Sequence, residues 1–240
     1  MVGELVHLRE KGRRKPEFAE IGGLAVTRCT LYDPPGLPQW RLEYRLRRAE
    51  RTLVKAGTGR VLLADDFPYR DLLRELRPVD PLPFWRAIAD LLALSALEQA
   101  GIRPERGRVA LSAPRLCPEL RTAAERLCPR VRGLVIDAPG VGEDYARWLH
   151  LHFGLPVTPI SAGADVTVAF GPGGGRWGRS LELYGQAKLD GLAVTAEGTQ
   201  LPEDCRDQVL ALLWERGALD RSALVISGGR QPPRKTGGTA

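Results

Sequence analysis

Four short apolar runs, each ending near a proline or glycine, most constrain what this chain can fold into. None of them alternates cleanly with polar residues, and most are rich in leucine or β-branched residues. Continuous apolar runs bounded by breaking residues are typical of strands that are covered on both faces, as in parallel sheets. The runs lie within residues 60–68, 108–114, 133–140 and 165–173.

Segments with helical spacing precede or separate these runs, and the spacing predicts helices over residues 39–56, 82–99, 118–127 and 143–153. Strands that alternate with helices predict βαβ crossovers and a mostly parallel sheet. The layout over residues 40–227 resembles Rossmann-like proteins in general, which implies a three-layer α/β sandwich. The resemblance rests on this alternation and on no specific motif, so it implies a fold and not a function.

The flanks of this region have a different pattern. Residues 17–38 predict a hairpin that turns at Gly22–Gly23, followed by a proline-rich connector. After residue 170 we expect antiparallel additions to the sheet, because two short segments alternate as half-buried strands do. The alternating segments are residues 180–185 and 191–198, and a helix over 203–216 and a strand over 223–227 follow them.

These patterns predict three parts of the chain. Residues 1–38 form a basic segment and hairpin extension, residues 39–227 form one Rossmann-like domain, and residues 228–240 form a disordered tail. The tail has almost no apolar residue to bury, which is typical of disorder.

The net charge of +6 in 240 residues lies at the two ends of the chain. Basic ends can contact nucleic acid, although an arginine-rich composition is also typical of a coding bias. The most apolar helix candidate, residues 82–102, carries three charges, and the N-terminus has the reverse order of a signal peptide. We therefore expect a cytoplasmic protein that does not enter a membrane.

The four cysteines are spread without paired spacing, which favours free thiols in a cytosolic protein over disulfides or zinc ligands. His150 and His152 point to opposite sides of the predicted helix and cannot chelate one ion, so we expect no structural metal. Cys117 comes just before a predicted helix, a position that can lower the pKa of a thiol.

The glycine-rich stretch Gly171–Gly178 raises the question of a phosphate cradle. Phosphate-binding glycine loops lead into a helix whose N-terminus holds the anion, and here an alternating segment follows instead. We therefore expect a connection between two strands. An indole and two guanidinium groups suit stacking and anions, so residues of this loop could also close over a ligand as a lid. The candidate lid residues are Arg176, Trp177 and Arg179.

A second glycine-containing turn joins the third apolar run to the next helix. Gly140 and Gly142 match the first two positions of a dinucleotide fingerprint, but Tyr145 stands where the third glycine would be. Glu143 and Asp144 would repel a pyrophosphate at that helix end. The turn is either a non-standard nucleotide site or an ordinary tight turn.

In open parallel sheets, ligands bind beyond the carboxyl ends of the strands. Carboxylates at this edge could hold a ribose, a cation or an amine, or they could cap loops and helices. The candidate strand-end cluster is Asp65, Asp66, Ser112, Asp137, Gly140 and Gly142.

No complete catalytic motif is present, and no serine lies in a G-x-S-x-G frame. The first hypothesis is a Rossmann-like protein that binds a small ligand or a partner protein, with no identified catalytic residue or cofactor. The second is a methyl- or hydride-transfer enzyme that uses a nucleotide-type cofactor. The third is a nucleic-acid-associated factor whose phosphate contacts are the basic segment Arg9–Lys15, the arginine face of residues 41–55 and the C-terminal tail.

Overall fold

The computed structural model describes residues 1–12, 15–154, 160–174 and 176–228. The fold class is α/β with mostly parallel strands, as predicted. The chain divides into two compact units. Unit 1 contains Met1–Pro81 and Thr195–Leu224, and unit 2 contains Leu82–Val194 and the chain from Val225 onward.

Unit 1 contains a five-stranded sheet with the order β2-β3-β1-β4-β5. Strand β1 pairs in parallel with β3 and β4, β4 pairs in parallel with β5, and β2 pairs antiparallel with β3. The strands are β1 (Val2–Leu8), β2 (Glu17–Ile21), β3 (Leu24–Tyr32), β4 (Arg60–Leu63) and β5 (Arg77–Pro78).

The predicted hairpin is β2–β3, and it turns at Gly22 and Gly23, whose φ angles are +56° and +84°. Its place in the fold differs from the prediction of a separate extension. Residues 2–8, for which the sequence predicts no strand, form β1 at the centre of the sheet, and Val2 and Leu5 are buried there. Residues 1–38 therefore supply three of the five strands of a sheet that also contains β4.

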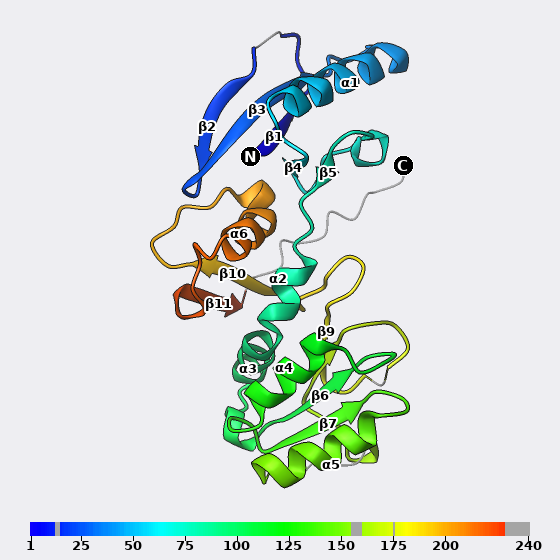
Figure 1. The fold of residues 1–240 in the computed structure, drawn as a ribbon, viewed down its shortest axis with the longest axis vertical. Helices are drawn as coiled ribbons and strands as arrows, with labels where there is room; N and C mark the ends of the chain where they lie inside the picture. The colour runs from blue at the N-terminus through cyan, green and yellow to red at the C-terminus, as the bar shows by residue number, and fades with distance from the viewer. Residues whose placement is uncertain (13–14, 155–159, 175, 229–240) are drawn as a thin grey trace, which may run out of the picture. The chain divides into compact units, whose positions relative to one another are not determined.

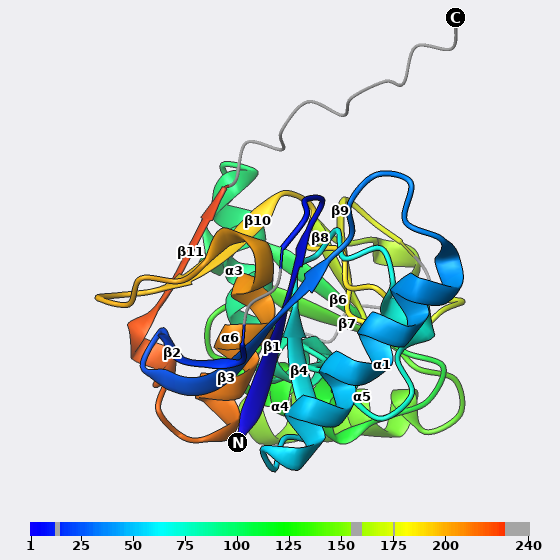
Figure 2. The same cartoon turned by 90° about the horizontal axis from the view of Figure 1, so that it is seen from above.

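Helices cover both sides of this sheet (Figures 1 and 2). Helix α1 (Gln39–Lys55) packs against β3 and buries Leu42, Leu46 and Leu53 in the core of unit 1. Helix α6 (Arg206–Glu215), preceded by a 3-10 turn at Glu203–Cys205, lies on the other side. Unit 1 is therefore itself a three-layer arrangement.

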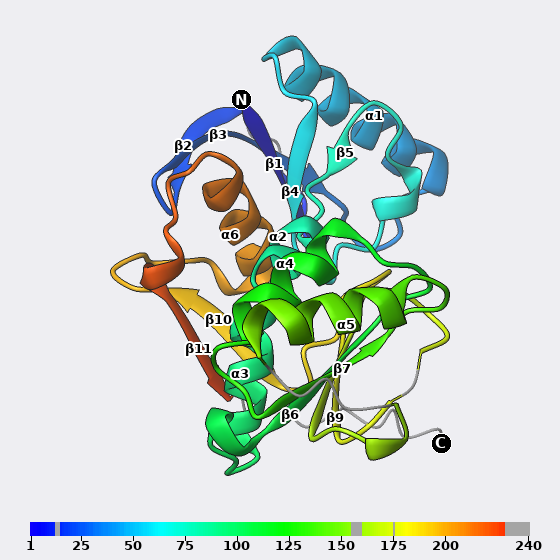
Figure 3. The ribbon, with the colours of Figure 1, turned by 60° about the horizontal axis from the view of Figure 1, so that its bottom comes forward.

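Unit 2 contains a four-stranded parallel sheet with the order β7-β6-β8-β9. Helix α5 lies along β7 on one face, and α3 and α4 lie on the other (Figures 1 and 3). The elements are α2 (Leu82–Ala87), α3 (Ala89–Gln99), β6 (Arg108–Ser112), α4 (Pro118–Leu127), β7 (Gly133–Asp137), α5 (Gly142–Phe153), β8 (Val166–Ala169) and β9 (Arg179–Glu182).

The predicted antiparallel direction of residues 180–185 is wrong. Strand β9 pairs in parallel with β8, and Val166 at the start of β8 faces Arg179 at the start of β9. The parallel register places Trp177, just before β9, beside the start of β8. The segment before β9 is held by Thr167, whose Oγ1 donates to the carbonyl of Trp177 at 2.7 Å and accepts from its amide at 2.8 Å.

Strands β10 (Leu192–Ala196) and β11 (Leu224–Gly228) form a separate two-stranded sheet. The predicted helices agree with the structure within a few residues, except that residues 82–99 form two helices that break at Ile88. The predicted disordered tail lies outside the described residues beyond Gly228. None of the described helices is long and apolar enough to cross a membrane.

Candidate functional site

The structure divides the predicted strand-end cluster between two sheets. Asp65 and Asp66 follow β4 in unit 1, whereas Ser112 and Asp137 end β6 and β7 in unit 2. Ser112 and Asp137 face each other in the β6–β7 register, and the Ser112 hydroxyl donates to Asp137 Oδ2 at 3.2 Å. The cluster therefore reduces to this serine–aspartate pair, because its four polar residues do not share one edge.

The glycine loop packs onto this pair. A Cβ placed on Gly174 would lie 1.4 Å from Ser112 Oγ and 3.1 Å from Asp137 Oδ2, and one on Gly171 would lie 2.4 Å from the Pro114 ring. Ser112 is completely buried. The glycines are thus needed for close approach of the loop to the strand ends, where the loop itself fills the space beside the pair.

The three candidate lid residues already have partners within unit 2. Arg176 pairs with Glu182 at 2.9 Å and donates to the Tyr184 hydroxyl at 3.0 Å. Arg179 pairs with Asp190 at 2.6 Å. Trp177 is held through its backbone, as described above. These contacts are structural, and a lid role stays a prediction.

The second glycine turn has the geometry of a tight connection. Gly140 has a φ of +83°, a conformation that favours glycine, and Gly142 begins α5 with Ala138 close by. Glu143 and Asp144 occupy the first turn of α5, as expected. Binding of a nucleotide at this turn stays a prediction.

Asp65 and Asp66 lie near the acidic start of α6. The Asp65 amide donates to the Asp204 carbonyl at 2.9 Å. Burial, together with the nearby charge of Asp65, raises the pKa of Asp207 to about 6. Desolvation also raises the pKa of Asp65 above its ordinary value. Within the described parts of the chain, no three His, Cys, Asp or Glu side chains group as a metal ion requires.

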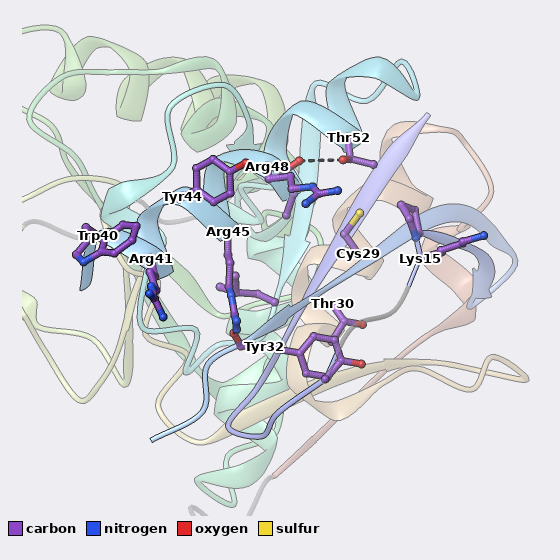
Figure 4. Close-up of a pocket in the computed structure, with 14 residues that line it drawn as sticks. Lys15, Cys29, Thr30, Tyr32, Trp40, Arg41, Tyr44, Arg45, Arg48 and Thr52 are labelled. Carbon is purple, nitrogen blue, oxygen red and sulfur yellow. Dashed lines mark hydrogen bonds between the residues drawn. The ribbon is translucent and has the colours of Figure 1, made fainter. Parts of the chain in front are cut away.

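A cavity of about 610 Å³ lies in unit 1 between α1, β3 and the chain that precedes β2 (Figure 4). This volume falls within the range of small-molecule sites. Its lining combines basic and aromatic side chains with the small residues of β3. The basic and aromatic members are Lys15, Tyr32, Trp40, Arg41, Tyr44, Arg45 and Arg48.

Helical spacing explains why α1 supplies half of this lining. Residues 41, 44, 45, 48 and 52 fall on one stripe of the helix and line the cavity, whereas Leu42, Leu46 and Leu53 fall on another and enter the core. The apolar side chains of Trp40 and Tyr44 do not belong to the buried stripe of α1. They lie beside the arginines and are 66% and 63% exposed.

The described lining of the cavity carries positive charge that no described side chain neutralises. Among the described residues, four cations line it, namely Lys15, Arg41, Arg45 and Arg48, and no carboxylate does. Within the described residues, none of these four forms an ion pair, whereas Arg28, Arg51 and Arg60 of the same unit all do. An uncompensated group of cations in a hollow attracts anions.

Two contacts fix the walls of the cavity. Arg45 Nη1 donates to the Tyr32 carbonyl at 2.7 Å, which ties α1 to the end of β3. A Cβ on Gly12 would lie 2.2 Å from the Tyr32 ring, so glycine allows the chain before β2 to pack against that ring. The guanidinium carbon of Arg41 lies 5.0 Å from the centre of the Trp40 ring, a cation–π distance.

The thiols show no sign of activation. All four cysteines are free. Burial raises the pKa of Cys29, which lines the cavity, and that of Cys117, whose position before a helix does not lower it. Burial also raises the pKa of Cys128 to about 11 and that of Cys205 to about 12. A protonated thiol is a poor nucleophile, so the cavity is suited to binding and not to thiolate chemistry.

The fold and this cavity describe an α/β protein with a cationic, aromatic pocket. No protein-family model matches the chain, and no curated protein matches it. Among solved structures, L-tryptophan dehydrogenase from Nostoc punctiforme is similar to part of the chain, with 16% sequence identity and a TM-score of 0.31. The match covers 60% of this chain and 43% of the dehydrogenase, so it spans less than half of that protein. A likeness at this level does not identify a function.

Proposed function

We propose that the protein binds a phosphorylated ligand that carries an aromatic ring, a nucleotide-class molecule, in the cavity of unit 1. The observation that carries this proposal is a cavity of about 610 Å³ whose described lining holds four cations and no carboxylate. This is a form of the small-ligand hypothesis, with the ligand placed on α1 and not at a strand end.

The ligand chemistry follows from the side chains. A guanidinium group offers paired N–H donors that match phosphate oxygens, and Arg41 and Arg48 are both exposed. Trp40 and Tyr44 offer faces on which a planar ring can stack. A multiply charged anion with an aromatic part satisfies both features, whereas a neutral or cationic ligand does not match the positive charge of the lining.

Calorimetric titration with a nucleoside diphosphate and with inorganic pyrophosphate tests the proposal. We expect both to bind, with the nucleotide tighter because its base stacks. Arg48→Ala should weaken each by about tenfold, the equivalent of about 1.4 kcal/mol for one charge-assisted contact.

Arg147→Ala is the matched control, because Arg147 is an exposed helical arginine of α5 in unit 2. It should leave both affinities unchanged. Absence of heat with both anions, or equal loss in Arg48→Ala and Arg147→Ala, would contradict the proposal.

A further inference from the structure

The two most exposed aromatic side chains of the cavity stand on one helix. Trp40 and Tyr44 are four residues apart on α1, which places their Cβ atoms about 5–6 Å apart. About two thirds of each residue is open to solvent, at 66% and 63%. A free nucleotide has one base to stack, whereas this helix offers two exposed aromatic side chains in succession.

The cations are also arranged in a row. Arg41 and Arg48 are separated by seven residues of α1, or about 10 Å along the helix axis. Lys15 stands on a different wall, supplied by the chain before β2 (Figure 4). This spacing suits several phosphates of a chain better than the adjacent phosphates of one nucleotide.

We infer that the natural ligand of this cavity is a single-stranded nucleic acid, whose bases stack on Trp40 and Tyr44 and whose backbone runs past Arg41, Arg45, Arg48 and Lys15. This inference deepens the proposed function and rests on it. An unpaired strand exposes its base faces, which a duplex buries, and stacking platforms flanked by cations are the common way to bind one.

Fluorescence anisotropy with a labelled oligothymidylate and a labelled oligouridylate of about 12 nucleotides tests the inference. We expect both oligonucleotides to bind saturably and more tightly than a nucleoside diphosphate. A duplex of the same length should bind more weakly than either single strand. The affinity should fall as the salt concentration rises. A plot of log association constant against log salt concentration should have a slope of about −0.7 for each phosphate contacted. The two oligonucleotides distinguish a preference for RNA or DNA.

Aromatic substitutions separate stacking from charge. Trp40→Ala and Tyr44→Ala should each weaken oligonucleotide binding by about 5- to 100-fold with little change in salt slope. Tyr44→Phe keeps the ring and should bind as the unchanged protein does. Arg48→Ala should lower the salt slope by about 0.7. Trp148→Ala, on α5 of unit 2, is the control for loss of a partly exposed tryptophan.

The outcomes separate this inference from the proposed function. If a nucleoside diphosphate binds but the oligonucleotides bind no tighter, or bind equally to Trp40→Ala and Tyr44→Ala, the inference is overturned and the proposed function stands. If neither class of ligand binds, both are overturned. Thermal unfolding of every variant establishes that a lost signal reflects the site, because both aromatic side chains are exposed and their removal should leave the fold intact.

Discussion

Gln208 forms hydrogen bonds with both backbone groups of Leu63. Its Nε2 donates to the Leu63 carbonyl at 2.7 Å, and its Oε1 accepts from the Leu63 amide at 3.0 Å. Gln208 is 3% exposed. The side chain thus takes the place of a neighbouring strand at the end of β4, where β5 is only two residues long.

Replacing Gln208 with Leu should therefore destabilise unit 1. The buried amide and carbonyl of Leu63 lose their partners, at a cost on the order of 2 kcal/mol in the free energy of unfolding. Urea denaturation measures the change. Gln39→Leu, at an exposed glutamine of α1, is the matched control and should change the free energy by less than about 0.5 kcal/mol. Equal values for the two variants would contradict the role of Gln208.

Glu50 is a buried carboxylate that organises the chain before β5. Its Oε1 accepts hydrogen bonds from the amides of Arg74 and Glu75 at 2.8 Å and 3.0 Å, and Glu50 is completely buried. Glu50→Ala should lower the free energy of unfolding by about 3 kcal/mol, since it removes a charge-assisted acceptor.

Glu50→Gln should cost less than Glu50→Ala because it keeps one acceptor oxygen. Hydrogen exchange should show the amides of Arg74 and Glu75 losing protection in the alanine variant. Glu20→Ala, at an exposed glutamate of β2, is the control and should leave those amides protected. Unchanged protection in Glu50→Ala would show that Glu50 does not hold this segment.

The raised pKa of Asp207 predicts how the free energy of unfolding depends on pH. Its pKa is raised to about 6 from an ordinary value of 3.8. Between pH 4 and pH 6, as set by these two values, the folded state keeps a proton that the unfolded state releases. Stability should therefore fall as the pH rises through this window, by an amount on the order of 3 kcal/mol.

Asp207→Asn removes the group that titrates. The variant should be more stable than the unchanged protein at neutral pH, and the difference should shrink as the pH falls toward 4. Thermal unfolding across this range measures both effects. Asp71→Asn, at an exposed aspartate, should give no such convergence. A pH-independent difference for Asp207→Asn would contradict the assignment.

Gly174→Ala should disturb the glycine loop of unit 2. The new Cβ would lie 1.4 Å from Ser112 Oγ, so the loop must move away from the strand ends, at a cost of about 1–3 kcal/mol. Adding Ser112→Gly should recover part of this loss because it removes the two atoms nearest to the new methyl group. Gly59→Ala, where no atom lies within 4 Å, is the control. A double variant no more stable than Gly174→Ala would show that Ser112 is not the obstacle.

The periodicity of the sequence predicts the class of fold and most helices, because buried strands and amphipathic helices differ in spacing. It does not show which strands belong to which of the two sheets, because a buried strand is a continuous apolar run in either sheet. Strand β1 was missed because its apolar residues are followed closely by a charged segment. The direction of β9 was wrong because alternation is common to parallel and antiparallel edge strands.

The cavity could be predicted only in part. The arginines of α1 and the segment Arg9–Lys15 both enter the nucleic-acid hypothesis, and the structure brings Lys15 of that segment to the arginines. The exposure of Trp40 and Tyr44 could not be predicted from their apolar character, which is the usual signal for burial. The stronger signal was Leu42, Leu46 and Leu53, which already complete a buried stripe and leave the aromatic residues outside it.

Unit 1 is assembled from the two ends of its chain, with unit 2 inserted between Pro81 and Thr195. A ribosome makes Leu63 long before it makes Gln208, so the end of β4 lacks its hydrogen-bonding partner during synthesis of the whole of unit 2. Unit 2 is continuous up to Val194 and can begin to fold while unit 1 is still incomplete. The cavity on α1 therefore belongs to a unit whose second segment is made only after the 113 residues from Leu82 to Val194.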